Sequence, residues 1–118
     1  GRRRMAIIYI AGPMTGLKGF NLDSFNLAEL ALMEQGHEVR NPACLGHGWA
    51  NYEHYMEIDL VMLGQCEAIV FLPGSEKSPG AQREAERAKE LGPESVTPLL
   101  REVWDALQVA YIKNGGSL

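Results

Sequence analysis

The feature that most constrains the fold is a continuous apolar segment that leads directly into a polar loop and a helix-forming stretch. Residues 68–72 read AIVFL, and a Pro-Gly pair ends the run. An apolar run without alternation is typical of a strand covered on both faces, as in a parallel sheet. The Ala- and Glu-rich stretch at residues 79–91 is predicted to be a helix stopped by Gly92. A buried strand over residues 67–72 followed by this helix indicates an α/β protein.

The rest of the chain repeats this alternation. Apolar runs and turn residues predict further strands at 6–11 and 37–40, and a short one at 95–99 that Pro98 weakens. Further helices are predicted at 23–35 (capped by Asp23 or Ser24), at 51–65 (with Tyr55, Ile58, Met62 and Leu63 facing inward) and at 100–112. We therefore predict a single-domain, Rossmann-like (flavodoxin-like) three-layer sandwich with a four- to five-stranded parallel sheet.

Length and composition fit one domain. The chain has 118 residues, and we expect leader or vector-derived residues at 1–5, the domain at 6–113 and a C-terminal tail at 114–118 whose first residues fray. A formal charge of −4 disfavours binding to a nucleic acid polymer, and no apolar run is long enough for a membrane span. Two cysteines without metal-ligand spacing are typical of reduced thiols in a cytoplasmic protein.

Ligands of open parallel sheets bind outside the carboxyl ends of the strands. That rule selects two loops, residues 12–21 and 73–80, which are both rich in Gly, Ser, Thr and Pro. In the second loop, Ser78 and Gly80 lie at a predicted helix N-terminus, where free N–H groups and the helix dipole favour an anion such as phosphate. The alternative is a plain Ser N-cap with proline at the first helical position. The spacing is not that of a Walker loop, because Lys77 precedes the glycine.

Three residues are candidates for chemistry. Glu84 lies four residues after Gly80, so it is either a nucleophile or sugar ligand near this loop, or a surface carboxylate. Asp59 has apolar neighbours in sequence, which favours either a desolvated general acid or an exposed acid on an amphipathic helix. Tyr9 ends the first strand, where it either orients a carboxylate or packs as an ordinary strand aromatic.

No metal site is expected. His54 and Glu57 are spaced i, i+3, and His47 lies nearby, but no further ligand follows at a known interval. The sequence also lacks a dinucleotide-binding GxGxxG fingerprint and a Ser-His-Asp arrangement. We therefore expect no cofactor.

Taken together, these motifs resemble the nucleoside 2-deoxyribosyltransferase-like superfamily. The resemblance is carried by residues 9–13 (YIAGP), by Asp59-Leu60 with an acidic residue, Glu67, eight positions after the aspartate, and by Gly80 with Glu84 four positions on. The string YIAGPMTG at 9–16 is similar to that of small phage and prophage domains of this group. The spacing Ser78-x-Gly80-x-x-x-Glu84 is similar to that of the 2'-deoxynucleoside 5'-monophosphate N-glycosidases. The likeness spans about residues 6–92.

The resemblance implies a role for each matching residue. Glu84 matches a nucleophile that attacks the anomeric carbon, Asp59 an acid that contacts the sugar or protonates the base, and Tyr9 a tyrosine that positions the nucleophile. Ser78 matches a serine that holds a 5'-phosphate. The remaining substrate-binding residues that we expect are Gly12, Pro13, Met14, Thr15, Gly16, Asn21 and Gly80.

The chain also departs from the pattern of these relatives. Thr15 stands where the monophosphate hydrolases carry an arginine, and Ser75 where the phage domains usually carry an aromatic residue. Pro79 replaces a basic or aliphatic residue, and Glu67 stands where aspartate is usual. These differences bear on substrate identity.

The resemblance implies an N-glycosidase or deoxyribosyltransferase that cleaves the N-glycosidic bond of a (deoxy)nucleoside 5'-monophosphate. The relatives bind substrate at subunit contacts, so a homodimer or larger homo-oligomer is expected. The alternative is a protein of phage or prophage origin that binds a nucleotide or nucleotide-derived signal without turning it over.

Overall fold

The computed structural model describes residues 5–45, 51–92, 94–95 and 100–118. The helices are α1 (Leu22–Glu34), α2 (Tyr52–Gly64), α3 (Pro79–Leu91) and α4 (Arg101–Lys113), with short 3-10 turns η1 (Lys18–Asn21), η2 (Pro42–Cys44) and η3 (Ser75–Lys77). The strands are β1 (Ile7–Ala11), β2 (Glu38–Arg40), β3 (Ala68–Phe71) and the two-residue β4 (Glu94–Ser95).

The strands form one parallel sheet in the order β2-β1-β3-β4. β1 lies at its centre and pairs with β3 from Ile8 opposite Ala68 to Ala11 opposite Phe71. The predictions of an α/β protein and a parallel sheet are confirmed. The described residues contain no fifth strand. Of the strand predicted at 95–99, Ser95 pairs within β4 and residues 96–99 lie outside the described part of the chain.

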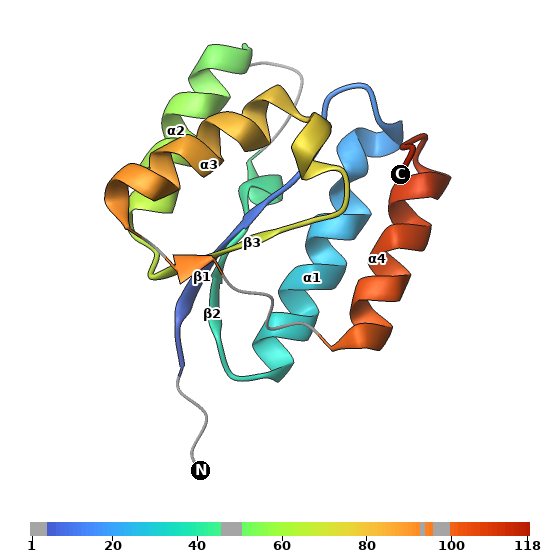
Figure 1. Ribbon diagram of the computed structural model, residues 1–118, viewed down its shortest axis with the longest axis horizontal. Helices are drawn as coiled ribbons and strands as arrows, with labels where there is room; N and C mark the ends of the chain where they lie inside the picture. Colours follow the sequence, from blue (N-terminus) through green and yellow to red (C-terminus); the bar gives the residue numbers. More distant parts are fainter. Residues whose placement is uncertain (1–4, 46–50, 93, 96–99) are drawn as a thin grey trace.

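The helices cover both faces of the sheet: α1 and α4 lie together on one face, α2 and α3 on the other (Figure 1). Alternation along β1 divides its side chains between these faces. Ile8 and Ile10 pack into the core beside α1 and α4, whereas Tyr9 and Ala11 pack with residues of α2 and α3. Tyr9 therefore points to the face on which α3 lies.

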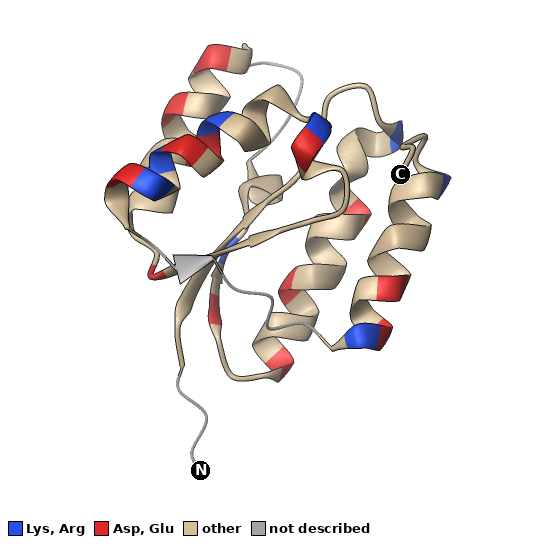
Figure 2. Ribbon diagram, in the orientation of Figure 1, with Lys and Arg blue, Asp and Glu red and all other residues tan. Residues whose placement is uncertain are grey.

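Charged residues are concentrated on the helices, and β1 and β3 carry none (Figure 2). Most charged side chains of the helices are exposed, but Glu84 of α3 is buried. No helix in the described residues combines the length and the apolar character that crossing a membrane requires.

Some sequence predictions need correction. The N-cap of α1 is Asn21, with a left-handed backbone (φ 60°), not Asp23 or Ser24. Ile58 is 42% exposed, and Met56 and Leu63 supply the buried side of α2. The tail does not fray at its start, because Asn114 is buried and donates hydrogen bonds to Asn21 and Asp23. The predictions for residues 1–4 and for His47 lie outside the described residues.

Candidate active site

A cleft of about 670 Å³ opens at the carboxyl ends of β1 and β3. After β1 the chain turns to α1 on one face of the sheet, and after β3 it turns to α3 on the other (Figure 1). Two neighbouring strands whose connections leave in opposite directions create a crevice at that edge. The cleft is lined by Pro13, Met14, Thr15, Leu17, Phe20, Pro42, Tyr52, Tyr55, Met56, Asp59, Gly74, Lys77, Ser78, Pro79, Gly80, Glu84 and Tyr111.

Glu84 is a buried carboxyl group in the wall of this cleft. It belongs to the inner side of α3, between the buried Ala81 and Ala88 at helical spacing, and it is only 4% exposed. The hydroxyl of Tyr9, which is fully buried, donates a hydrogen bond to Glu84 Oε2. Glu84 is therefore not the solvated surface acid that the sequence left as the alternative, and a buried carboxyl group in a cleft is a candidate functional group.

Asp59 brings a second carboxyl group to the same cleft, from α2. Its Oδ1 atom is buried and has no hydrogen-bond partner among the described residues. Burial raises the pKa of Asp59 to about 7. Burial, together with repulsion from Asp59, raises the pKa of Glu84 to about 8, while the hydrogen bond from Tyr9 opposes the rise. Burial and the nearby Glu84 raise the pKa of Tyr9 well above its usual value, so Tyr9 remains a donor.

The N-terminus of α3 forms the other end of the cleft. Ser78 is the N-cap, and its Oγ accepts a hydrogen bond from the N–H of Ala81 at 3.2 Å. Pro79 has no N–H to offer. Within the described residues, the N–H of Gly80 has no acceptor, since its amide takes part in none of the hydrogen bonds that form there. Of the free N–H groups expected at this helix N-terminus, only that of Gly80 remains among the described residues. The hydroxyl of Ser78 lies beside it in the sequence and can still donate its proton.

The loop after β1 contributes only part of what was expected. Pro13, Met14 and Thr15 line the cleft, but Gly12, Gly16 and Asn21 do not. A Cβ at Gly12 would approach the side chain of Leu72 to 3.0 Å, so close packing of β1 on β3 accounts for this glycine.

Asn21 has a structural position behind the loop. Its Nδ2 donates to the carbonyl of Pro13 at 3.0 Å, and its Oδ1 accepts from Ser24 and from Asn114. These bonds hold consecutive left-handed residues, Phe20 (φ 55°) and Asn21 (φ 60°), a conformation that is costly outside glycine. Phe20 is thereby fixed at the rim of the cleft.

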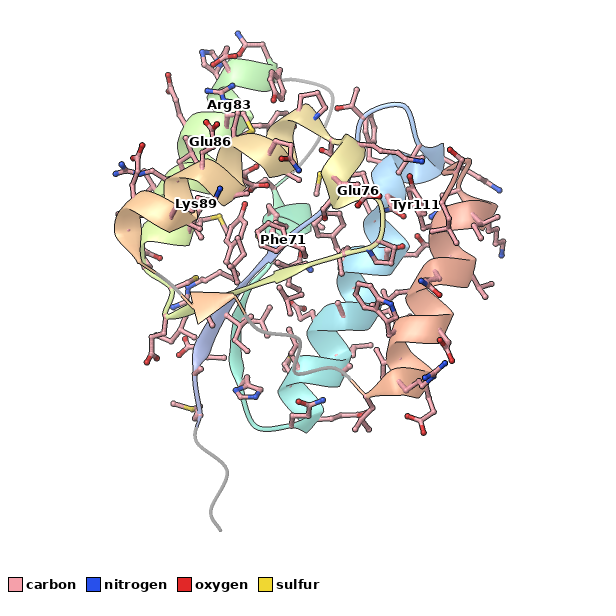
Figure 3. The ribbon with its side chains drawn as sticks, in the orientation of Figure 1. Phe71, Glu76, Arg83, Glu86, Lys89 and Tyr111 are labelled. Atoms are coloured by element: carbon pink, nitrogen blue, oxygen red, sulfur yellow. The ribbon has the colours of Figure 1, made fainter. Side chains whose placement is uncertain are left out.

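Several lining residues were not expected from the sequence. Tyr52 and Met56 enter from α2, where their spacing with Asp59 marks one helix side. Tyr111 of α4 reaches the cleft from the opposite face of the sheet (Figure 3) because Gly74 leaves room for it: a Cβ at Gly74 would lie 2.4 Å from the tyrosine ring. Gly74 has a positive φ (89°), and it lies in the turn that the Pro-Gly pair predicts from the sequence.

Two departures from the resembling proteins have structural explanations. Ser75 is buried, and its hydroxyl donates to the carbonyl of Leu72 at 2.6 Å, which closes the turn after β3. Glu67 accepts a hydrogen bond from the N–H of Ile7 at 3.2 Å at the other end of the sheet, away from the cleft. In the described residues, no group of three or more His, Cys, Asp or Glu is placed to hold a metal ion.

Comparison with known proteins identifies the family of the chain. Residues 6–97 match the family described as a domain of unknown function, DUF4406. The chain belongs to this family. The match includes β1, α2 and α3, which supply Tyr9, Asp59 and Glu84. It stops before α4, so Tyr111 lies outside it. No curated protein matches the chain.

Proposed function

We propose that this DUF4406 chain is an N-glycosidase or deoxyribosyltransferase acting on a (deoxy)nucleoside 5'-monophosphate. The observation that carries the proposal is the buried Glu84, hydrogen-bonded by Tyr9 and lining one cleft with Asp59 and Ser78. Strand order β2-β1-β3-β4 and helices on both faces support a Rossmann-like three-layer sandwich related to the nucleoside 2-deoxyribosyltransferase-like superfamily. The proposal includes a homo-oligomeric, cytoplasmic protein of phage or prophage origin.

In the proposed reaction, the carboxylate of Glu84 attacks C1' of the sugar. The C1'–N bond breaks, its electron pair leaves with the base, and the base takes a proton from Asp59 or from water. A glycosyl ester of Glu84 results. Water or a second base then attacks C1' and gives up a proton to Asp59 or to water, and the electron pair of the ester C–O bond returns to Glu84.

The two carboxyl groups suit these different roles. A pKa of about 7 keeps Asp59 partly protonated near neutral pH, as a general acid must be. Glu84 must be ionised to attack, and the donor at Tyr9 favours the ionised form. The charge that develops on the sugar is positive, so an adjacent buried carboxylate also stabilises the transition state.

One observation favours a second function, binding of a nucleotide without turnover. With a pKa of about 8, Glu84 is largely protonated at neutral pH, and a neutral carboxylic acid is a poor nucleophile but a good donor to a ligand. A protonated Glu84 would hydrogen-bond a sugar hydroxyl. A sensor or sequestering protein needs no more than this.

The two functions are separated by incubating the purified chain with a panel of nucleosides and nucleoside 5'-monophosphates and measuring free base by chromatography. We expect release of base from at least one 5'-monophosphate. If no base is released but a ligand raises the melting temperature, the chain is a nucleotide-binding protein and not an enzyme. If no compound releases base or shifts the melting temperature, both functions are wrong.

Gly80→Ala tests whether the ligand approaches the N-terminus of α3. An added Cβ lies 3.5 Å from the nearest atoms of Tyr52 and Met56, an ordinary contact, and alanine favours helix, so we expect stability unchanged or raised by about 0.5 kcal/mol. The methyl group stands beside the free amide, and we expect KM for the 5'-monophosphate to rise roughly tenfold. Gly64→Ala, where an added Cβ approaches only Leu91 at 4.0 Å, is the matched control. Equal KM values for the two variants would contradict this placement of the ligand.

A further inference from the structure

The charges in the cleft are unevenly placed. Asp59 and Glu84 are its acidic lining residues, and Lys77 is the one cation among the lining residues that the structure describes. Lys77 ends η3 directly before the cap of α3, so it stands at the end of the cleft that also holds Ser78 and Gly80. Along α3, the four residues from Gly80 to Glu84 span about 6 Å of helix axis. Glu84 therefore lies about one helical turn from the end of the cleft at which the backbone of Lys77 lies.

The ammonium group of Lys77 is held by the C-terminal tail. Its Nζ donates to the carbonyl of Ser117 at 2.5 Å and lies 3.3 Å from the Ser117 hydroxyl. The same carbonyl accepts from the hydroxyl of Tyr111 at 3.2 Å. An ammonium group has three protons, and a phosphate oxygen is a stronger acceptor than a peptide carbonyl. The tail thus holds the ammonium group of a residue that lines the cleft, and one of its protons is left for an anion.

An anionic ligand needs this cation. Carboxyl groups with pKa values of about 7 and 8 are partly ionised near neutral pH, and they repel a phosphate ester that enters the same cleft. Thr15 is uncharged, and one free amide with one hydroxyl at the N-terminus of α3 supplies only neutral donors. A sugar without phosphate meets no such repulsion and needs no cation.

We infer that Lys77 is the specificity-determining residue of the cleft, binding the phosphate of the substrate and selecting a 5'-monophosphate over the corresponding nucleoside. The claim that a nucleotide is the substrate rests on the proposed function. The claim that Lys77 binds a phosphate rests only on the charges in the cleft. Ser78 Oγ and the N–H of Gly80 complete the donors around the phosphate, and Ser117 orients the ammonium group.

The test compares Lys77→Met with the wild-type chain on a matched pair of substrates, a nucleoside and its 5'-monophosphate. We expect kcat/KM for the monophosphate to fall roughly 10- to 100-fold, mainly through KM, with kcat/KM for the nucleoside unchanged. Lys77→Arg, which keeps the charge, restores most of the loss. Lys89→Met removes an exposed lysine on α3 (Figure 3), outside the cleft lining, and changes neither value. Equal losses on both substrates, or no loss on either, would overturn the inference.

A second measurement keeps this result separate from the proposed reaction. Calorimetric titration with ribose 5-phosphate and with ribose requires no turnover. We expect the wild-type chain to bind ribose 5-phosphate more tightly than ribose, and Lys77→Met to lose that difference. If the wild-type chain releases no base but shows this difference, the proposed reaction fails and the assignment of Lys77 holds. If the wild-type chain binds ribose 5-phosphate no more tightly than ribose, Lys77 does not bind the phosphate group.

Discussion

Replacing Glu84 by glutamine is expected to lower the release of base by at least roughly a thousandfold while leaving the fold intact. Glutamine has nearly the same shape as glutamate, and its Oε1 can still accept the hydrogen bond that Tyr9 donates. What it lacks is the negative charge that forms the bond to C1'. The loss is therefore expected in kcat, with KM nearly unchanged. Steady-state kinetics on the monophosphate that the wild-type chain cleaves best measure both constants.

The matched control is Glu86→Gln. Glu86 is exposed on the outer side of α3 (Figure 3), two residues from Glu84, so Glu86→Gln makes the same chemical replacement on the same helix but outside the cleft. We expect wild-type kinetics from it. Base release by Glu84→Gln at the rate of Glu86→Gln would rule out the glycosyl ester, whatever the ligand. A Tyr9→Phe variant with kcat lowered less than Glu84→Gln is the pattern expected of a positioning residue.

The meeting of Tyr9 and Glu84 in the structure agrees with two periodicities of the sequence. Alternation along β1 separates Tyr9 from Ile8 and Ile10, and helical spacing along α3 places Glu84 between Ala81 and Ala88. Each pattern is local. The parallel pairing of β1 with β3 brings Tyr9 close to α3, which carries Glu84.

The inward side of α2 was predicted only in part: Leu63 is buried and Met62 packs against the core, but Ile58 is exposed and the buried Met56 was missed. Residues 58–63 are apolar apart from Asp59, so the pattern itself cannot tell which side faces the core. The structure buries Met56 and Leu63 and exposes Ile58 and Val61. Asp59 lies at helical spacing with Met56 and Leu63, so its carboxyl group lies on the buried side of α2.

The end of the cleft that holds Lys77 depends on contacts that no local pattern contains. Tyr111 and Ser117 come from the end of the chain, and they meet Lys77 and Gly74 only because α4 packs on the face opposite α3. Asn21 and Phe20 adopt left-handed conformations that their residue types disfavour, and long-range bonds to Asn114 help to hold them. Such features follow from tertiary packing, so sequence periodicity cannot reveal them.

The buried carboxyl group should also make the stability of the chain fall as pH rises. The pKa of Glu84 is about 8 in the folded chain against a usual 4.5, so between these values the folded state holds a proton that the unfolded state has lost. Stability from this group is complete below pH about 4.5 and is lost as pH rises to about 8. At about 1.4 kcal/mol per pH unit, the loss is on the order of 3 to 5 kcal/mol.

Glu84→Gln removes this loss because an amide does not titrate. We expect its free energy of urea unfolding to match that of the wild-type chain near pH 4.5 and to exceed it by a few kcal/mol at pH 8, with no further change above that pH. Asp59 is present in both chains, so its own titration largely cancels. Equal stabilities at pH 4.5 and pH 8 would mean that Glu84 reaches solvent when it ionises. The expected result would instead identify a carboxyl group kept at a cost to stability, as a group retained for its chemistry is.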